Sequence, residues 1–292
     1  MIDRALLRYF LAVVDTGSFS RAAAQERVSQ PTVSAAITRL EGLLGTPVFD
    51  RSSRRVALTP AGARLVAPAR RIEAEFAEAE RAAADVAPSR LVRLGVASTI
   101  PVGLLEAVIA PLAGHEGDSV EVVERRPGEL AALLERGRVD VVLGPVSAGA
   151  ARAVELFGEP YLLALPGGHR LAGLATVEPG DCEGETMMVR RNCEALPLVS
   201  QFFTARGVRP FMAARSASDE RIAALVRAGL GLTVMPRSLG GEGIALKPLA
   251  GFDHVRRVGF TLEPGEHGRL ERSEGFARMV DAARGWAARE AG

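Results

Sequence analysis

The spacing of apolar and polar positions over the first 45 residues predicts three short helices. Apolar residues recur at helical spacing over about 3–15, and the stretch "TGS" ends this segment. Ser18 or Ser20 is placed to cap a second helix, whose alanine run leaves room for close helix packing. After the turn "RVS", Ser29 or Gln30 is placed to cap a third helix.

The third predicted helix has two faces of different character. Val33, Ile37, Leu40 and Leu44 fall at i, i+4, i+7 and i+11, so they form one buried stripe, and Gly45 ends the helix. The opposite face and its flanks are small or polar, with no bulky side chain to keep the helix out of a groove. These residues are Pro31, Thr32, Ser34, Ala35, Thr38 and Arg39.

The stretch "TPVFDRSSRRVALT" predicts two short strands around a polar turn, which together make a wing. Three helices followed by a wing are typical of a winged helix-turn-helix domain, and the alternative is a helical bundle with a hairpin. The first 58 residues carry eight arginines against five carboxylates, whereas the whole chain has a net charge of +1. Arg51, Arg54 and Arg55 concentrate this charge in the wing, the pattern that phosphate binding requires.

The next segment predicts a long single helix. Thr59 is placed to cap it, Pro60 takes its first position, and helix formers dominate as far as Val86. A helix of about 28 residues, ~42 Å long, with one narrow apolar stripe usually pairs with a copy of itself. Pro68 lies inside it and is expected to remove a backbone hydrogen bond and bend the helix locally. The stretch "APS" at 87–89 marks its end.

From residue 91 onward, strand and helix patterns alternate, which predicts an α/β fold with a largely parallel sheet. The predicted strands are about 91–97, 120–124, "GRVDVVLG", 159–165, "LGLTVMP" and "VRRVGFTLEP". The predicted helices are about 102–112, 129–136, 196–206, 219–228 and 273–289.

Composition excludes several classes of protein. The 292 residues suggest about two domains, and no apolar run approaches the ~20 residues that span a bilayer. The first residues lack the features of a signal peptide, so we expect a cytoplasmic protein and not a secreted solute-binding protein. Two cysteines, Cys182 and Cys193, and four scattered histidines predict no disulfide framework, metal site or cofactor. An enzyme is the remaining alternative, but no G-x-S-x-G, Walker, HExxH or complete G-x-G-x-x-G motif is present.

These patterns closely resemble the LysR-type transcriptional regulators. The specific match covers about residues 2–66, through "LLRYFLAVVDTGSFSRAAAQERVSQPTVSAAITRLEGLLGTPVFDR" and "LTPAG". The remainder matches more loosely, through "GELAALLERGRVDVVLG", "LPGGHRLA" and "SDERIAALVRAGLGLTVMP". The resemblance implies a winged helix-turn-helix, a linker helix that dimerises, and a two-lobed α/β effector domain like the periplasmic binding proteins. The expected boundaries are 1–58, 59–88 and 89–292, with lobe I at about 91–159 and 266–292 and lobe II at about 160–265.

The resemblance also implies a DNA-binding surface. Gln30, Pro31 and Ser34 match the recognition-helix motif of the family, and this helix is expected in the ~12 Å major groove of double-stranded DNA. The chain departs from the family at Ala35 and Ala36, where a long polar residue often follows the serine, which favours contact with a thymine methyl or dependence on DNA shape. The expected DNA-binding residues are Ser29, Gln30, Pro31, Thr32, Ser34, Ala35, Thr38, Arg39, Arg51, Arg54 and Arg55.

The stretch "GVASTIPVG" is a strand end followed by a helix start. Hydroxyls of Ser98 and Thr99 and free N–H groups of the first turn predict an anion site best suited to a carboxylate, and the alternative is an ordinary helix cap. Asp219 and Glu220, in the first turn of their helix, are interpreted as structural. The resemblance places the effector between the lobes, and the expected contacts are Ser98, Thr99, Ile100, Pro127, Gly128, Gly144, Pro145, Val146, Arg190, Arg191 and Cys193.

Cys193 falls where the peroxide-sensing branch of this family carries a reactive cysteine. The second cysteine of that branch is absent, so a disulfide switch is not expected and a one-cysteine sensor remains the alternative. The resemblance further implies a tetramer of two dimers and leaves RNA polymerase open as a partner. Closure of the lobes on the effector is expected to change subunit orientation, DNA bending and promoter contact.

Overall fold

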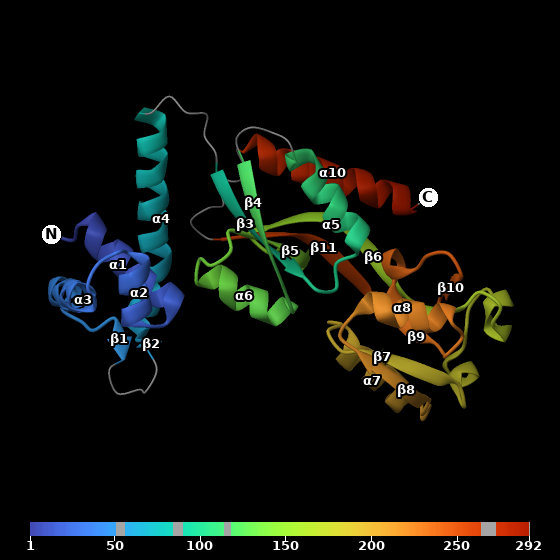
Figure 1. The fold of residues 1–292 in the computed structure, drawn as a ribbon. Coiled ribbons are helices and arrows are strands. Elements are labelled where there is room, and N and C mark those ends of the chain that lie inside the picture. Colours follow the sequence, from blue (N-terminus) through green and yellow to red (C-terminus); the bar gives the residue numbers. More distant parts are fainter. Residues whose placement is uncertain (51–55, 84–89, 114–117, 264–272, 292) are drawn as a thin grey trace.

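The computed structural model describes residues 1–50, 56–83, 90–113, 118–263 and 273–291. Figure 1 shows three helices gathered at one end of a long helix, with two α/β lobes beside them. The turn of the predicted wing, with Arg51, Arg54 and Arg55, lies outside the described residues, as does the end of the predicted linker helix.

The N-terminal helices begin at the capping residues that the sequence indicates. They are α1 (Arg4–Thr16), α2 (Phe19–Gln25) and α3 (Gln30–Leu44). Side chains of Asp3, Ser18 and Ser29 each accept a hydrogen bond from a backbone N–H of the first turn. Such a cap stabilises a helix by about 1 kcal/mol. Ser18 rather than Ser20, and Ser29 rather than Gln30, are therefore the caps.

Helices α1 to α3 and the wing together form the head, and the predicted apolar stripe of α3 lies in its core. Val33, Ile37 and Leu40 are at most 1% exposed and pack with α1. Strands β1 (Phe49–Asp50) and β2 (Ala57–Leu58) pair antiparallel, as predicted for the wing. The ring of Phe49 lies against Phe10 of α1, with ring centroids 5.4 Å apart, so the base of the wing is fixed to the helices.

Helix α4 (Pro60–Ala83) follows the wing directly. Thr59 accepts a hydrogen bond from the backbone N–H of Gly62 at 3.1 Å, which confirms the predicted cap, and the helix continues through Pro68. Val66 is fully buried against the head, whereas Ile72 and Phe76 are 40% and 44% exposed. The apolar stripe of α4 therefore stays partly exposed, although the Arg4 guanidinium of α1 lies over the Phe76 ring, 4.7 Å from its centroid.

The main sheet is mixed, so the prediction of a largely parallel sheet is wrong. Strands β3 (Arg90–Ala97), β4 (Asp118–Arg125) and β5 (Val141–Pro145) are parallel, but β11 (Val255–Leu262) pairs antiparallel with β5. The strand order is β10-β6-β11-β5-β3-β4, in which β6 spans Ala153–Pro166 and β10 spans Ile244–Lys247. Strand periodicity reports the burial of each strand and carries no information on its direction, which here is set by the chain returning from lobe II.

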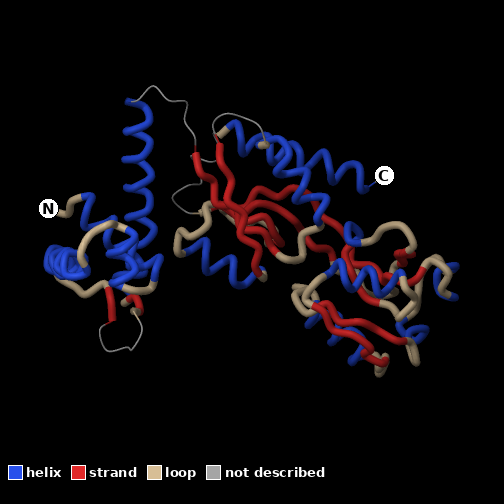
Figure 2. Tube along the Cα trace, viewed as in Figure 1, coloured by secondary structure: helices blue, strands red, loops and turns tan. Residues whose placement is uncertain are grey.

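Strand β6 (Ala153–Pro166) joins the two lobes. Its first half pairs with β11 in lobe I, and its second half pairs with β9 (Thr233–Pro236) and β10 (Ile244–Lys247) in lobe II. The prediction begins this strand at residue 159, whereas pairing with β11 extends it back to Ala153. Figure 2 shows this strand running between the lobes.

Helices cover both faces of the lobe I sheet. Helices α5 (Val102–Ile109) and α10 (Glu274–Ala291) lie on one face, where Leu104 and Trp286 pack with the strands. Helix α6 (Pro127–Glu135) lies on the other face, with Leu130 fully buried. These positions agree with the arrangement in Figure 1.

Lobe II adds a second, two-stranded parallel sheet made of β7 (Thr186–Arg190) and β8 (Phe211–Ser216). Helix α7 (Leu196–Ala205) and helix α8 (Asp219–Arg227) contribute to two separate apolar clusters. Strands β7, β8 and β10 are not among the predicted strands. Strand β8 is mostly exposed and all four residues of β10 are half-buried, so neither shows a strict alternation of buried and exposed positions. Short 3-10 helices complete the fold at η1 (Ala110–Leu112), η2 (Arg170–Gly173), η3 (Pro179–Cys182) and η4 (Arg237–Leu239).

The head and lobe I meet at a small ionic cluster. Asp15 of α1 pairs with Arg70 of α4 at 2.5 Å and with Arg138 of lobe I at 2.9 Å. Arg138 also donates to the backbone oxygen of Val14 at 2.8 Å. Burial lowers the pKa of Arg70, although the charge of Asp15 opposes this effect.

Within the residues that the structure describes, no helix is long and apolar enough to cross a membrane.

Candidate functional site

The exposed face of α3 forms one continuous surface. Gln30, Pro31, Ser34, Ala35, Thr38 and Arg39 together line an open hollow on it. Ser29 and Thr32 lie exposed at the start of the same helix, with their hydroxyl oxygens 2.8 Å apart. The structure therefore brings the eight α3 candidates to one side of the helix, opposite the buried stripe.

The chemistry of this surface suits a nucleic acid. Its lining residues include one cation, Arg39, and no carboxylate, and Arg39 has no ion pair to any residue that the structure describes. Short side chains such as Ala35 allow the helix backbone to approach a groove wall, and the major groove of about 12 Å admits a helix. The wing arginines Arg51, Arg54 and Arg55 lie outside the described residues, so their positions stay a prediction.

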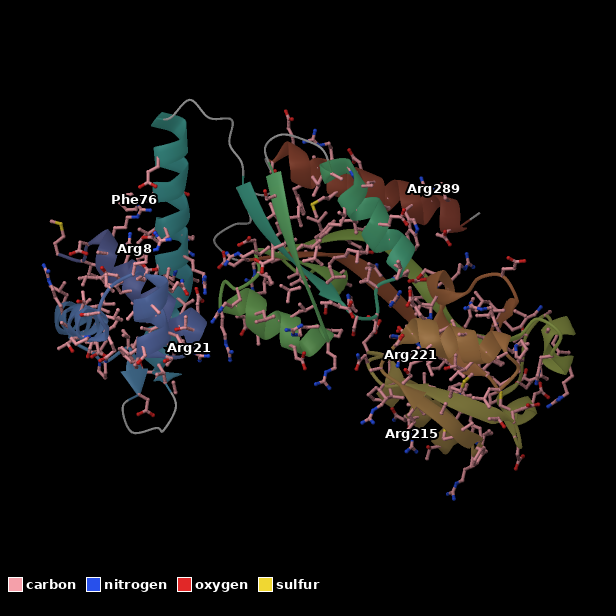
Figure 3. All side chains as sticks on the ribbon, in the orientation of Figure 1. Arg8, Arg21, Phe76, Arg215, Arg221 and Arg289 are labelled. Atoms are coloured by element: carbon pink, nitrogen blue, oxygen red, sulfur yellow. The ribbon has the colours of Figure 1, made fainter. Side chains whose placement is uncertain are left out.

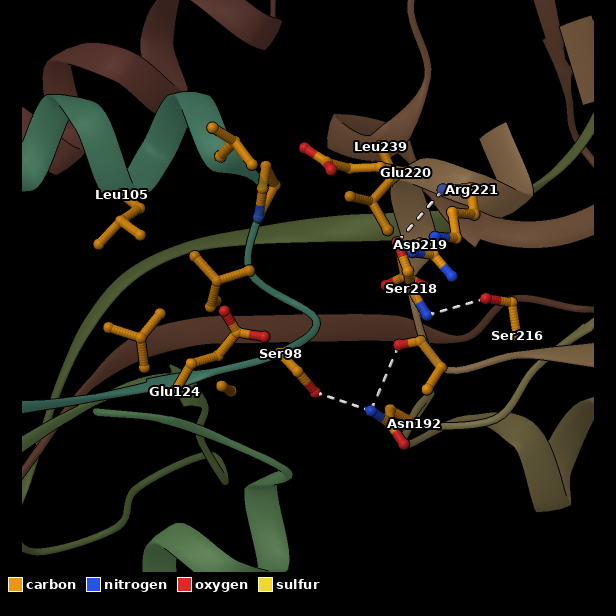
Figure 4. Close-up of a pocket in the computed structure, with 16 residues that line it drawn as sticks. Ser98, Leu105, Glu124, Asn192, Ser216, Ser218, Asp219, Glu220, Arg221 and Leu239 are labelled. Carbon is orange, nitrogen blue, oxygen red and sulfur yellow. Dashed lines mark hydrogen bonds between the residues drawn. The ribbon is translucent and has the colours of Figure 1, made fainter. Parts of the chain in front are cut away.

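A second site lies between the two lobes. Figure 4 shows a pocket, about 480 Å³ in volume, between the loop after β3 and the start of α8. Ser98 and Ile100 of the predicted effector residues line it. Lobe I further contributes Glu124, and lobe II contributes Asn192 and the stretch 216–221. The pocket is thus built from segments of both lobes.

One side chain bridges this pocket. Asn192 donates from Nδ2 to the hydroxyl oxygen of Ser98 at 3.1 Å and to the backbone oxygen of Ala217 at 3.3 Å. Ser98 belongs to lobe I, whereas Asn192 and Ala217 belong to lobe II. A change in the angle between the lobes therefore has to break or lengthen the bond to Ser98 (Figure 4).

A buried arginine holds the other side of the lobe junction. Arg256, at the start of β11, is 3% exposed and donates to Glu159 at 2.7 Å and to the backbone oxygen of Thr99 at 3.0 Å. Glu159 also accepts from the backbone N–H of Ser238 at 2.7 Å. Glu194 lies 3.5 Å from Arg256 and completes the cluster. Glu159 belongs to β6 and Arg256 belongs to β11, so this network ties these two neighbouring strands to the loop after β3.

The structure corrects the interpretation of the strand end at Ser98 and Thr99. The cap position of α5 is Pro101, without a side-chain hydrogen bond, so neither hydroxyl caps that helix. Thr99 is fully buried, and its hydroxyl has no hydrogen-bond partner within the described chain. Residues 98–100 form a turn, in which the N–H of Ile100 donates to the backbone oxygen of Ala97 at 2.9 Å, and α5 starts only at Val102. Ser98 lines the pocket instead, whereas Thr99 faces the interior.

The predicted cation Arg190 is bound to a carboxylate of its own lobe. Its Nε and Nη2 donate to the two carboxylate oxygens of Asp219 at 2.7 and 2.6 Å, and its side chain is 1% exposed. Burial opposes the charge, but hydrogen bonds and charge from Asp219 outweigh it and raise the pKa of Arg190. Asp219 thus has a structural role, as expected, because it neutralises the buried Arg190. Glu220, for which the same role was expected, is exposed and lines the pocket. Arg191 is exposed and does not line the pocket.

Cys193 lies beside this pair and not in the interlobe pocket. Its sulfur is 3.3 Å from Nη1 of Arg190 and 3.5 Å from the hydroxyl of Tyr161, and the residue is 7% exposed. Burial raises the pKa of Tyr161. Cys182 is a separate, fully buried free thiol, and burial raises its pKa to about 11. No group of three or more metal-ligating side chains comes together among the described residues.

The remaining predicted contacts lie at the same sheet edge but outside the interlobe pocket. Pro127 and Gly128 begin α6, just after β4, while Gly144 and Pro145 end β5. Val146 follows them and donates its N–H to the backbone oxygen of Arg257 at 2.9 Å. The carboxyl ends of the parallel strands β3, β4 and β5 meet at this edge, as the alternation of elements predicts.

Sequence reasoning missed several residues that line the pocket. Among them are Asn192, which lies between the predicted Arg191 and Cys193, and Glu124, Ser216, Ser218, Glu220, Arg221 and Leu239. One signal was available: Ser218 precedes an acidic first turn, and its side chain accepts from the N–H of Arg221, so a helix start is readable in "SDER". That signal locates the helix, but the sequence does not show that its start faces the other lobe.

The fold and the two sites define a class of protein. The chain has a winged helix-turn-helix with an exposed recognition face, and a helix joins it to a two-lobed domain with a pocket between the lobes. This combination defines the class of DNA-binding regulators with an effector domain. Residues 5–63 match the bacterial regulatory helix-turn-helix protein domain of the lysR family, and residues 86–284 match the LysR substrate binding domain.

Individual relatives agree with this class. The chain is 35% identical to a probable hydrogen peroxide-inducible genes activator of Mycobacterium avium, over 80% of this chain and 77% of that protein. It is 30% identical to the DNA-binding transcriptional dual regulator OxyR of Escherichia coli, over 94% of both chains. Full-length OxyR from Pseudomonas aeruginosa shares the fold with a TM-score of 0.71, at 23% identity over 97% of this chain and 95% of that one.

The chain belongs to the LysR family of transcriptional regulators. It is a DNA-binding regulator with an effector domain, and the family consists of transcription regulators and not enzymes.

Proposed function

We propose that α3 enters the major groove of an operator and that a small carboxylate effector, held between the lobes, changes how the protein binds or bends that DNA. The observation that carries the first half is the hollow on α3, which gathers six of the predicted contact residues on a surface without a carboxylate. The interlobe pocket supports the second half, because its walls come from both lobes.

The proposed DNA contacts divide by chemistry. Gln30, Ser34 and Thr38 carry amide or hydroxyl groups suited to base edges, and Ala35 fits a thymine methyl. Arg39 contacts phosphate, and Ser29 and Thr32 at the helix start do the same. Pro31 sits in the first turn, where a missing N–H removes no helix hydrogen bond. In this proposal the wing arginines Arg51, Arg54 and Arg55 add phosphate or minor-groove contacts.

The lining of the interlobe pocket favours a particular effector. The first turn of α5 lines it through residues 101–102 and carries no carboxylate, and helix starts attract anions. Glu124 and Glu220, the second at the start of α8, lie in the same lining and favour a positively charged group. We therefore infer an effector with a carboxylate toward the start of α5 and an amino group toward the two glutamates. Ser98 and Ile100 contact it, whereas Arg190 acts indirectly by holding Asp219.

Exposed apolar residues support self-association. Ile72 and Phe76 continue the stripe of α4, which fits pairing of two linker helices. Val122 is 45% exposed on β4, a strand at the edge of the lobe I sheet, which fits a second contact between effector domains. In the proposed assembly two dimers form a tetramer, with residues 1–58, 59–88 and 89–292 as the functional units and RNA polymerase as the further partner.

The DNA contact is tested by measuring affinity as a function of salt. Operator duplexes selected from random sequence with the full chain would be titrated by fluorescence anisotropy at several salt concentrations. The slope of log K against log salt is negative, and loss of one phosphate contact in Arg39→Ala is expected to make it shallower by about 0.9. Arg289→Ala is the matched control, since Arg289 is exposed near the end of α10, away from the head (Figure 3). Equal slopes for both variants would exclude the α3 assignment.

The wing is tested in the same assay. Arg54→Ala with Arg55→Ala is expected to make the negative slope shallower by about 1.8, which is about 0.9 for each phosphate contact. An unchanged slope and affinity would remove the wing from the interface.

The effector is tested by thermal stabilisation of the full chain. The compounds are small carboxylates, their uncharged amides, and amino acids with the same side chains. A bound effector at 100 times its Kd stabilises the folded state by about 2.7 kcal/mol. We expect stabilisation by an amino acid, less by its deaminated acid and none by its amide, and a smaller response in Glu124→Gln. Stabilisation by amides and acids alike would contradict the carboxylate assignment.

Peroxide sensing is a second candidate, and the position of Cys193 favours it. Two relatives are named for hydrogen peroxide or OxyR, and Arg190 approaches the Cys193 sulfur at 3.3 Å. In this alternative the Cys193 thiolate attacks one oxygen of hydrogen peroxide and forms an S–O bond while the O–O bond breaks. The products are a sulfenic acid and a hydroxide ion, which takes a proton from solvent to become water. A gain of one oxygen in the intact mass after mild peroxide treatment, absent in Cys193→Ser, supports it, and an unchanged mass excludes it.

A further inference from the structure

Lobe II contains a second cavity that the proposed function does not use. It lies between α7 and strands β7 and β8 and has a volume of about 700 Å³. None of the described residues that line it also lines the interlobe pocket. The interlobe pocket meets lobe II at the start of α8, so the two spaces open on different parts of the lobe.

The walls of this cavity are mostly apolar. Met187 from β7, Leu196, Val199 and Phe203 from α7, and Val208 from the following turn all line it. Cavities of about 300–1,000 Å³ with apolar walls and a few polar groups are typical of small-molecule sites. The flexible methionine adapts to chains of different shape, which suits an extended apolar ligand.

The charged groups of the lining all have the same sign. Arg190, Arg209 and Arg215 line the cavity, and the described lining contains no carboxylate. Arg190 is neutralised by Asp219, as described above. Arg209 and Arg215 are exposed and form no ion pair with any residue of the described chain. Figure 3 shows Arg215 at the lower edge of lobe II.

We propose that this cavity is a second ligand site, which takes an aliphatic carboxylate: an unbranched apolar chain with one anionic end. The chain lies against the α7 and β7 side chains, and the carboxylate lies at the mouth between Arg209 and Arg215. A neutral alcohol of the same length would leave both arginines unpaired, and an ammonium end would be repelled by them.

The site is one side chain away from the interlobe pocket. Nη1 of Arg190 reaches the sulfur of Cys193, which lines the cavity, while Nε and Nη2 hold Asp219, which lines the interlobe pocket. Occupants of the two spaces are therefore separated by a single buried guanidinium. This geometry makes it necessary to test the two sites with separate variants.

The experiment is isothermal titration of the full-length protein with octanoate, octylammonium and 1-octanol. Arg209→Gln with Arg215→Gln removes the proposed anion contacts at exposed positions, and Ser200→Trp fills the cavity mouth from an exposed position of α7. Arg237→Gln is the charge control, since Arg237 is exposed in lobe II and outside the lining. Glu220→Trp fills the interlobe pocket and serves as the site control. Thermal unfolding of each variant verifies that it is folded.

We expect octanoate to bind once per chain and octylammonium and octanol to bind at least tenfold more weakly. The double glutamine variant is expected to lose at least tenfold in octanoate affinity and Ser200→Trp to lose binding, while Arg237→Gln and Glu220→Trp keep it. Absence of octanoate binding to the wild type overturns the proposal. Loss of binding in Glu220→Trp would assign the ligand to the interlobe pocket instead. A changed sedimentation coefficient in Ser200→Trp, with octanoate binding retained, would show that another copy of the chain covers this surface.

Discussion

Removing the charge of Asp219 gives the sharpest test of how the effector domain is built. Asp219→Asn keeps the size of the side chain but leaves the Arg190 guanidinium, 1% exposed, without a carboxylate. Both of its charged hydrogen bonds, at 2.7 and 2.6 Å, are affected. Loss of one partner of a buried ion pair costs about 3–5 kcal/mol, because the other charge stays buried and uncompensated.

That free energy is large enough to measure directly. For a domain of about 200 residues, each kcal/mol lowers the melting temperature by about 2–4 °C, so Asp219→Asn is expected to melt about 6–20 °C lower. Urea denaturation followed by circular dichroism gives the same quantity as a change in midpoint at constant slope. The matched control is Glu220→Gln, which removes the same charge one residue further on, at an exposed position of the same helix turn. It is expected to change stability by less than about 0.5 kcal/mol.

A double variant separates the pair from its surroundings. Arg190→Met with Asp219→Asn removes both charges, and its loss of stability is expected to be smaller than the sum of the two single losses. The reasoning fails if Asp219→Asn loses less than about 1 kcal/mol, or if it matches Glu220→Gln. Arg190 would then be solvated, and free to serve the effector directly.

Three further predictions address other parts of the molecule. Ile72→Glu with Phe76→Glu is expected to break the contact between linker helices and to leave only the contact between effector domains, because each apolar side chain contributes about 1.5–3 kcal/mol when fully buried. Sedimentation velocity is expected to show a smaller assembly, and an unchanged sedimentation coefficient would exclude the α4 stripe as an interface. Burial, with the nearby charges, raises the pKa of Cys182 from 9.0 to about 11. The unfolded chain therefore loses this proton at lower pH than the folded chain, and the free energy of unfolding is expected to fall by about 2 kcal/mol between pH 9 and 11, relative to Cys182→Ala. Equal pH dependence of the free energy of unfolding in the two proteins would contradict this. Asn192→Ala removes the hydrogen bond to Ser98, which contributes about 1 kcal/mol to the contact between the lobes. The backbone amides of residues 97–100 are expected to exchange hydrogen faster in this variant, and unchanged exchange would mean that the bond does not hold the lobes together.

Local signals in the sequence predicted local structure well. Ser18, Ser29 and Thr59 act within one helix turn, and each caps the helix that its position indicates. The stripe of α3 follows from helical spacing, which also fixes the exposed face opposite it. The candidate DNA surface is predictable for this reason, since eight of its residues belong to one helix and need no information from elsewhere in the chain.

The candidate effector site depends on residues that are far apart in sequence. Arg190 and Asp219 are 29 positions apart, Asn192 and Ser98 are 94 apart, and Arg256 and Thr99 are 157 apart. Nothing near Arg190 indicates that its charge is already paired, so it is a natural candidate for an anionic ligand when only the sequence is read. Pairing of this kind follows from how the lobes fold together, and strand direction in the mixed sheet has the same origin.

The arrangement of the lobe junction implies how an effector signal leaves the pocket. Arg256 ties the crossing strands to Thr99 on one side, whereas a single hydrogen bond from Asn192 to Ser98 spans the other side. A ligand therefore changes the lobe angle most easily by replacing or strengthening the Asn192 contact, because the buried cluster resists movement. Arg138 and Asp15 join lobe I to the head, so under the proposed function we expect lobe II to be the part that moves relative to the exposed face of α3. In the proposed dimer we expect that movement to change the spacing of the two heads, and a ligand would shift this equilibrium only by its difference in affinity for the two arrangements.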